Sequence, residues 1–228
     1  MITANSRLRL TVEDFDFIIR VLAVKESDRI TLENLLTDEA LRNEILDHDL
    51  LAKAILESPE RLVISPQLMF YVLCRHVMRH TGASSRDVAD FVASLLDTFT
   101  RTTRIYQAGQ GLYTSYLSDM MLALSRASGH EAFLLRSHMA NYSLFVSGMF
   151  VENLERRKER GAPDVSYYEN VGGMNYSVAA DCRDAQRYHL SSIYEELARS
   201  FHEVRVALND LAARILFVDS PSLPIIMA

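Results

Sequence analysis

The stretch LSSIYEELARSFHEVRVALNDLAARI, Leu190 to Ile215, decides the fold class of this 228-residue chain. Its apolar residues recur at alternating intervals of four and three. A repeat of 3.5 residues is typical of an α-helix that keeps one stripe against a partner helix. The pattern therefore predicts one long C-terminal helix, continuous from about Asp184 to Phe217. Its apolar stripe, called the seam below, consists of Leu190, Tyr194, Leu197, Phe201, Val204, Leu208, Leu211 and Ile215.

The seam must be shielded from water, but its pattern does not show whether helices of the same chain or of a second chain shield it. Burying one such side chain contributes about 1.5–3 kcal/mol before entropy is subtracted. One interpretation is a bundle inside a single chain, in which the seam packs on other helices. The other is a dimer interface, in which the seam meets its copy in a second chain.

Composition supports a single helical domain that spans residues 1–228. Apolar residues make up 49% of the chain, and 8 glycines and 5 prolines are too few for a disordered or many-turned β-protein. The net charge of −6 argues against binding to nucleic acid or to anionic lipid. The two cysteines, Cys74 and Cys182, form no metal-type or redox-type motif, which favours reduced thiols in a cytoplasmic protein. No apolar run is long enough for a membrane span.

Local signals predict where several helices begin and end. Thr11 and Asp14 have the spacing of a capping box at a helix start. Ser65 and Pro66 form a second start, since proline is tolerated at the first helical position, and Gly82 ends that helix.

These signals predict an all-α multi-helix bundle of about seven to nine helices. We expect shorter helices over residues 11–60, the main bundle over 65–217 and an extended apolar tail over 218–228. The segment 130–160 is apolar around most of its circumference in the middle, which predicts a buried central helix. The segment 162–176 contains glycine, proline and three tyrosines, and it is predicted to be a loop that serves as a hinge or lid.

His76 and His80 are the first candidates for a binding site. They lie four residues apart, so they share one face of a helix and have the spacing of two metal ligands. The zinc-protease motif fails, because Val77 stands where that motif has glutamate. Arg75 and Arg79 would also repel a dication. The simpler interpretation is the polar flank of a core helix, with an ion or anion site as the alternative.

Other constellations are weaker. Glu44 and His48 are also four residues apart, but acids here serve equally well as helix caps. No Glu-x-x-His pair of a di-iron bundle occurs, and no G-x-S-x-G or dinucleotide-binding motif is complete. Arg101 and Arg104 lie among threonines at an expected helix junction, where they would hold a phosphate or carboxylate or simply form a solvated connector.

These observations favour a non-enzymatic helical interaction or regulatory protein that is cytoplasmic and self-associates or binds a protein partner. We predict no catalytic residue, no metal and no cofactor. The alternative is a helical bundle, either an enzyme or a binding protein, that binds a small ligand or a metal in a pocket near the His76/His80 helix and the 162–176 loop. Its candidate residues are His76, His80, Arg101, Arg104, Tyr167 and Tyr168.

Overall fold

The computed structural model describes residues 1–57, 63–83, 85–107 and 117–217, with the side chains of residues 102–107, 216 and 217 outside that description. Within these ranges the chain forms thirteen α-helices, one 3-10 helix and no strand. The predicted all-α class is confirmed. The predicted number of helices is too low, because several segments expected to be continuous are interrupted.

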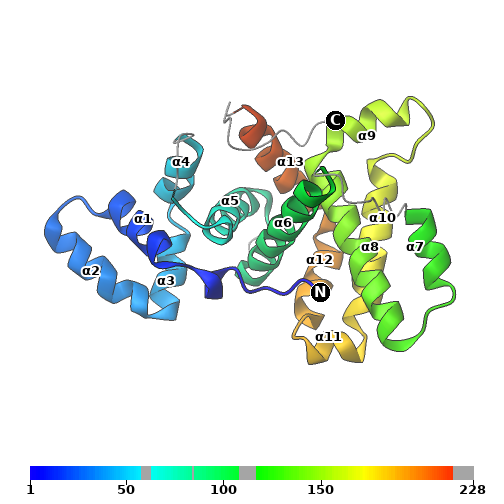
Figure 1. Cartoon of the computed structure of the whole chain (residues 1–228), viewed down its shortest axis with the longest axis horizontal. Coiled ribbons are helices and arrows are strands. Elements are labelled where there is room, and N and C mark those ends of the chain that lie inside the picture. The colour runs from blue at the N-terminus through cyan, green and yellow to red at the C-terminus, as the bar shows by residue number, and fades with distance from the viewer. Residues whose placement is uncertain (58–62, 84, 108–116, 218–228) are drawn as a thin grey trace.

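The elements follow one another as short and medium helices (Figure 1). Their bounds are η1 Arg7–Arg9, α1 Val12–Leu22, α2 Glu26–Thr37, α3 Glu39–Leu46, α4 Asp49–Glu57, α5 Pro66–Thr81, α6 Arg86–Gln107, α7 Leu117–Leu124, α8 Gly129–Met149, α9 Val151–Lys158, α10 Val165–Ala180, α11 Arg183–Arg187, α12 Ser191–Arg199 and α13 Phe201–Phe217.

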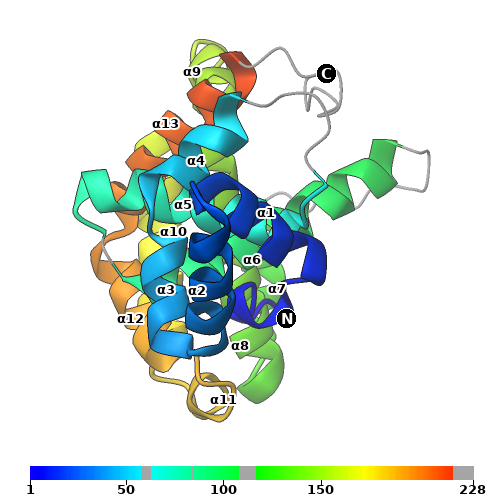
Figure 2. The same ribbon diagram turned by 90° about the vertical axis from the view of Figure 1, so that its left-hand side faces the viewer.

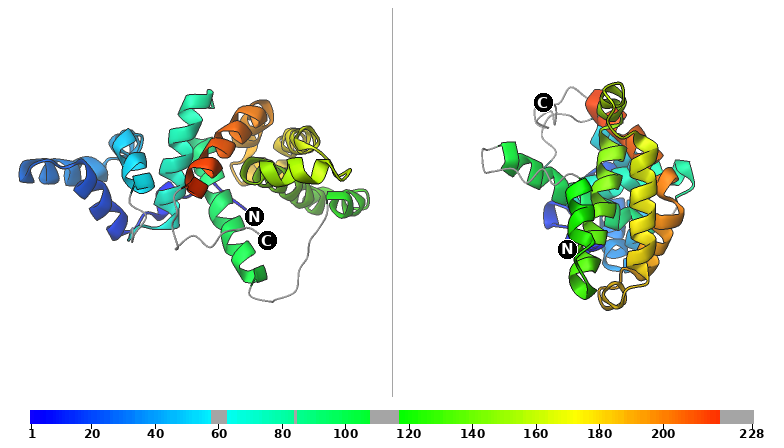
Figure 3. Two further views of the ribbon diagram at one scale, coloured as in Figure 1. Left: turned by 90° about the horizontal axis from the view of Figure 1, so that it is seen from above. Right: turned by 90° about the vertical axis from the view of Figure 1, so that its right-hand side faces the viewer.

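The helices form a bundle with an extension at one end. Helix α8 packs on α10 and α13, α5 packs on α6 and α13, and α10 packs on α12. Seen from above, α1 to α4 gather at one end of the molecule and α7 to α10 at the other, with α5, α6 and α13 between them (Figure 3). At the first end α2 and α3 lie side by side (Figure 2). In the described part of the chain, no helix has the length and apolarity that crossing a membrane requires.

The predicted helix ends are confirmed where local chemistry decides them. The Thr11 side chain accepts a hydrogen bond from the Asp14 amide, and the Asp14 carboxylate accepts one from the Thr11 amide at 2.8 Å, which completes the capping box of α1. The Ser65 hydroxyl caps α5, and Gly82 ends that helix with a φ of 89°, a conformation that suits glycine.

The continuous C-terminal helix predicted from Asp184 to Phe217 is wrong, because this segment contains α11, α12 and α13. His189 has a φ of 56° between α11 and α12. Ser200 leaves helical geometry between α12 and α13, and its hydroxyl donates to the Glu196 carbonyl at 2.7 Å. A serine that bonds the carbonyl four residues back competes with the backbone and bends helices, which accounts for the interruption.

The seam nevertheless stays on one side through the bend at Ser200. Helix α12 packs on α10, and α13 packs on α5 and α8 of the same chain. Ile215 at the end of the seam is partly buried. The other seven are buried: Leu190, Tyr194, Leu197, Phe201, Val204, Leu208 and Leu211. A single chain therefore covers almost the whole seam.

The segment 130–160 is also divided. Phe150 has φ and ψ of −130° and 37°, so the helix ends there and the charged helix α9 follows. Phe150 instead packs its ring edge-on against Phe145, with centroids 5.4 Å apart. Helix α8 buries Phe133 and other apolar side chains, but Leu134 is 39% exposed. The apolar circumference therefore does not place every side of α8 in the core.

The predicted hinge loop at 162–176 is wrong, because most of this segment belongs to helix α10. Gly172 in this helix permits close helix packing. A Cβ on Gly172 would overlap the Phe201 ring and lie 3.0 Å from the Cβ of Ser143. The predicted apolar tail, 218–228, lies outside the described residues.

Candidate functional site

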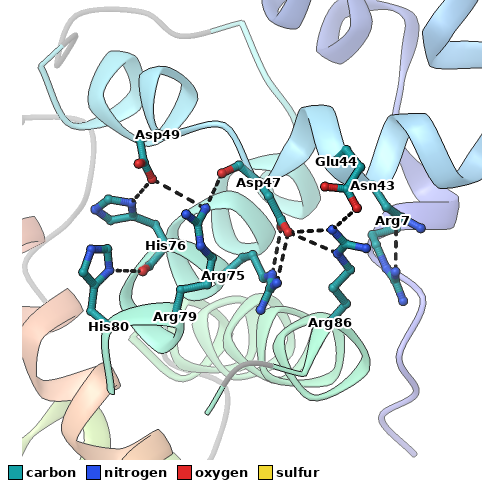
Figure 4. A network of polar contacts seen from close by, with 10 residues as sticks. All are labelled: Arg7, Asn43, Glu44, Asp47, Asp49, Arg75, His76, Arg79, His80 and Arg86. Atoms are coloured by element: carbon teal, nitrogen blue, oxygen red, sulfur yellow. Dashed lines mark hydrogen bonds and ion pairs between the residues drawn. The ribbon is translucent and has the colours of Figure 1, made fainter. Parts of the chain in front are cut away.

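A polar network joins the first four helices to the main bundle, and Asp47 lies at its centre (Figure 4). Asp47 follows the last turn of α3, and the short connection to α4 points its carboxylate at α5 and α6. Arg75 of α5 binds both carboxylate oxygens, at 2.8 and 3.0 Å. Arg86 of α6 binds Oδ2 through Nε at 3.1 Å and through Nη2 at 2.9 Å. The Asp47 carboxylate thus joins the connection between α3 and α4 to both α5 and α6.

The charges of this network compensate one another. Burial raises the pKa of Asp47, but hydrogen bonds and charge from Arg75 and Arg86 outweigh it, so the net pKa is lowered. The pKa of Arg86 is raised, first by its hydrogen bond with Glu44 at 2.7 Å and also by Asp47. The network therefore stays ionised at neutral pH and acts as a fixed clamp.

A second cluster fastens the N-terminal segment. Arg7 of η1 donates to Asp90 at 3.1 Å and to Asp87 at 2.6 Å, both on α6. It also donates to the Asn43 side chain of α3 at 3.2 Å, and its guanidinium lies 5.6 Å from the centre of the Tyr71 ring. Together with the Asp47 network, this cluster fixes the orientation of α1 to α4.

His76 and His80 lie beside this network, at the side of α5 that faces α4. His76 Nδ1 is 3.2 Å from Asp49 Oδ1, and Arg79 approaches the same oxygen at 3.6 Å. His80 Nδ1 is 2.7 Å from the His76 carbonyl oxygen. The two imidazole centroids are 5.0 Å apart with 59° between the ring planes. His76 is partly buried and His80 is exposed, so the pair opens to solvent.

The remaining ligand-binding candidates lie elsewhere. Arg101 pairs with Asp97 of the same helix at 2.7 Å, and the side chain of Arg104 lies outside the described residues. Tyr168 is buried in a small apolar cluster formed by side chains of α7, α8, α9 and α10. The Tyr167 hydroxyl contacts the sulfur of Met121 at 3.9 Å. The two tyrosines and the two histidines thus have separate surroundings.

The Glu44–His48 pair has structural partners. Glu44 binds Arg86, and His48 Nδ1 accepts from the Leu50 amide at 3.2 Å at the start of α4. This amide contact is a capping interaction. Across the ranges the structure describes, no group of three or more His, Cys, Asp or Glu side chains is placed to hold a metal ion.

A cavity of about 270 Å³ lies between α6, α8 and the N-terminal residues. Its polar groups come mainly from α8. The imidazole of His138 stacks on Phe99 at 6.2 Å and 11°, and burial lowers the pKa of His138. No local sequence pattern marks this cavity, because its two helices contribute residues some forty positions apart. The lining residues are Met1, Ile2, Thr98, Phe99, Leu134, Ser137, His138 and Asn141.

Comparison with known proteins identifies no relative, since no family model, curated protein or solved structure matches this chain.

Proposed function

We propose that this protein is a non-enzymatic helical interaction protein that self-associates through its first three helices. This segment, residues 12–46, is called the arm. The observation that supports the proposal is the exposure of large apolar side chains on and beside the arm: Leu8, Val12, Val24, Ile30 and Leu41. Val24 is 88% exposed and Ile30 is 60% exposed. Single exposed apolar residues are ordinary, but four within residues 12–46, with Leu8 shortly before them, favour a binding surface.

The seam is the weaker candidate for self-association, because helices of the same chain already bury it. A second chain would have to displace α5, α8 and α10 to reach it. The arm needs no such rearrangement. Because the Asp47 network fixes its orientation, the arm would lose little conformational freedom on binding.

The charge of the arm favours a basic surface as its counterpart. Residues 12–46 contain nine acidic and four basic side chains, a net charge of −5. Two arms would therefore repel each other. The basic end of α9, where Arg156, Arg157, Lys158 and Arg160 stand within five positions, is the complementary surface on a second copy. Contacts between two different surfaces of the same protein build rings or open chains of subunits. Because this contact pairs an acidic surface with a basic one, added salt should weaken the assembly.

Light scattering over roughly a hundredfold range of protein concentration tests the proposal by mass action. The average molar mass should rise with concentration and fall with added salt. Asp substitutions at Val24 and Ile30 should keep the protein monomeric, as should Glu substitutions at Arg156 and Arg157. Met174→Asp is the matched control, because Met174 is 58% exposed but lies on α10. A wild-type protein that stays monomeric throughout would refute the proposal.

The proposal also places the protein in the cytoplasm, where Cys74 and Cys182, both free thiols, remain reduced.

A second candidate function is the binding of a small planar ligand in the cavity between α6 and α8. The observation that favours it is the stack of His138 on Phe99 at the cavity wall, which leaves an imidazole available to a polar ring. Indole is a suitable probe, since a planar molecule of its size fits within a cavity of about 270 Å³. Binding of indole should raise the unfolding temperature of the wild-type protein. The unfolding temperature of Leu134→Trp should not change when indole is added, because the introduced tryptophan side chain occupies the cavity.

A further inference from the structure

We propose that His76 and His80 form a two-histidine site for a divalent transition-metal ion, with the Nε2 atoms of both rings as ligands and water completing the coordination. This inference goes beyond the proposed function. It rests on the tautomers that the surrounding groups impose, on the distance between the rings and on the local charge balance.

The contacts of the two Nδ1 atoms fix the tautomers. His76 Nδ1 faces the Asp49 carboxylate at 3.2 Å, and His80 Nδ1 faces the carbonyl of His76 at 2.7 Å. An ionised carboxylate and a carbonyl only accept hydrogen bonds, so each Nδ1 carries the hydrogen. In the neutral ring the lone pair then belongs to Nε2. Metal-binding histidines show the same arrangement, in which a carboxylate or backbone carbonyl holds the nitrogen that does not bind the metal.

The distance between the rings fits one shared ion. A zinc–nitrogen bond is about 2.0–2.1 Å, so the ion lies about 3.2 Å from each imidazole centroid, and a tetrahedral angle then places the two centroids about 5.2 Å apart. The observed separation is 5.0 Å. Both side chains project from the same side of α5, as Figure 4 shows, which agrees with their spacing of one helical turn.

Acidic groups balance the positive charge of the arginines that lie near the site. Arg75 is engaged by the Asp47 carboxylate, to which it donates twice. Arg79 donates to the Asp47 carbonyl and lies 3.6 Å from Asp49. Asp49 itself adds a negative charge beside His76. The repulsion expected from the sequence is thus reduced by acidic groups from the connection before α4 and from its first residue. Imidazole ligands suit zinc, nickel and copper.

The test uses the untagged full-length protein and titrates it with Zn²⁺ near neutral pH against a chromogenic chelator. We expect one equivalent to bind. His76→Gln and His80→Gln should each weaken this binding by at least about tenfold, because one ligand is lost and the remaining imidazole cannot chelate. Asp49→Asn should weaken it by about tenfold or more without removing a ligand, as changes to the groups that hold metal-binding histidines do.

His202→Gln is the matched control. His202 also has a carboxylate partner, with Nδ1 2.9 Å from Glu169, but it lies on α13, away from the His76–His80 pair on α5. Its replacement should leave Zn²⁺ binding unchanged. Circular dichroism of each variant checks that the fold is intact. The proposal is overturned if wild type and the His76→Gln/His80→Gln double variant bind Zn²⁺ equally, or if His202→Gln weakens binding as much as His76→Gln does.

Discussion

Gly172 of α10 lies directly against the Phe201 ring of α13, so closely that a Cβ at Gly172 would overlap ring atoms Cε2 and Cζ. Ser143 of α8 lies at the same point, since a Cβ built at Gly172 would be 3.0 Å from the Ser143 Cβ. Three helices therefore meet at a position that only a glycine fits. The neighbouring Gly173 has space around it, because a Cβ there would be no nearer than 3.7 Å to the Ala198 carbonyl oxygen.

This difference predicts opposite effects for two adjacent alanine substitutions. Gly172→Ala should lower the free energy of unfolding by about 1–3 kcal/mol, because the Phe201 ring must move. Gly173→Ala should raise it by up to about 1 kcal/mol, because alanine favours the helix over glycine and its Cβ would make only an ordinary contact with the Ala198 carbonyl oxygen. Urea unfolding followed by circular dichroism measures both values. Equal effects of the two substitutions would contradict the close packing of α10 on α13.

The Asp47 clamp gives a prediction about the buried charge of Arg75. Asp47→Ala leaves that guanidinium without its bidentate partner and should cost about 3 kcal/mol at neutral pH. The control is Glu44→Ala, which removes an exposed partner of Arg86 and should cost no more than about 1 kcal/mol.

The pH dependence of the Asp47 contribution follows from the direction of its pKa shift. The folded-state pKa lies below the ordinary value of 3.8. Its stabilisation is therefore complete above that value and is lost as the pH falls through the folded-state pKa. The stability difference between wild type and Asp47→Ala should shrink in this acid range. A difference that stays constant through acid pH would show that the carboxylate charge does not hold the clamp.

Asp14 joins the starts of two helices and should be more important than an ordinary cap. Its buried carboxylate accepts from the Thr11 amide, from the Ser65 amide at 2.7 Å and from the Ser65 hydroxyl at 2.6 Å. Asp14→Ala should cost about 3 kcal/mol, because three partly buried hydrogen bonds to one buried carboxylate are lost together. Asp38→Ala, which removes an exposed cap of α3, should cost about 1 kcal/mol. Chemical denaturation compares the two, and equal losses would contradict the bridging role of Asp14.

The features that the sequence predicts correctly are those that neighbouring residues decide. The Thr11–Asp14 capping box, the Ser65–Pro66 start and the Gly82 end each depend on groups within a few positions, so spacing alone identifies them. The all-α class follows in the same way from apolar periodicity.

The features that the sequence misses depend on contacts between distant segments. Gly172 indicates a loop when taken alone, whereas its reason is the ring of Phe201, almost thirty residues away. From the sequence alone, Arg75 is a charge that would repel a metal ion near His76. In the structure, Asp47 in the connection between α3 and α4 pairs with this charge. The pairing of His76 with Asp49 is equally invisible, because it joins α5 to α4. At these positions the sequence gives the residue type, but it does not show which distant residue is the contact partner.

The two thiols should differ in reactivity. Burial raises the pKa of Cys74 and removes its sulfur from solvent, whereas Cys182 is partly exposed in the connection between α10 and α11. We expect one thiol per chain to react with a chromogenic disulfide reagent in the native protein and two in denaturant. Cys182→Ser should abolish the native reaction. Rapid reaction of Cys74 in the folded protein would contradict the packing of α5.

One chain covers its own seam, and unfolding of Leu208→Ala at two protein concentrations tests this most directly. Leu208 is fully buried against Gly148 of α8. We predict a loss of about 2–5 kcal/mol that does not change with protein concentration, with the molar mass of the folded protein unaltered. A folded variant of unchanged stability but half the wild-type molar mass would show instead that the seam joins two chains.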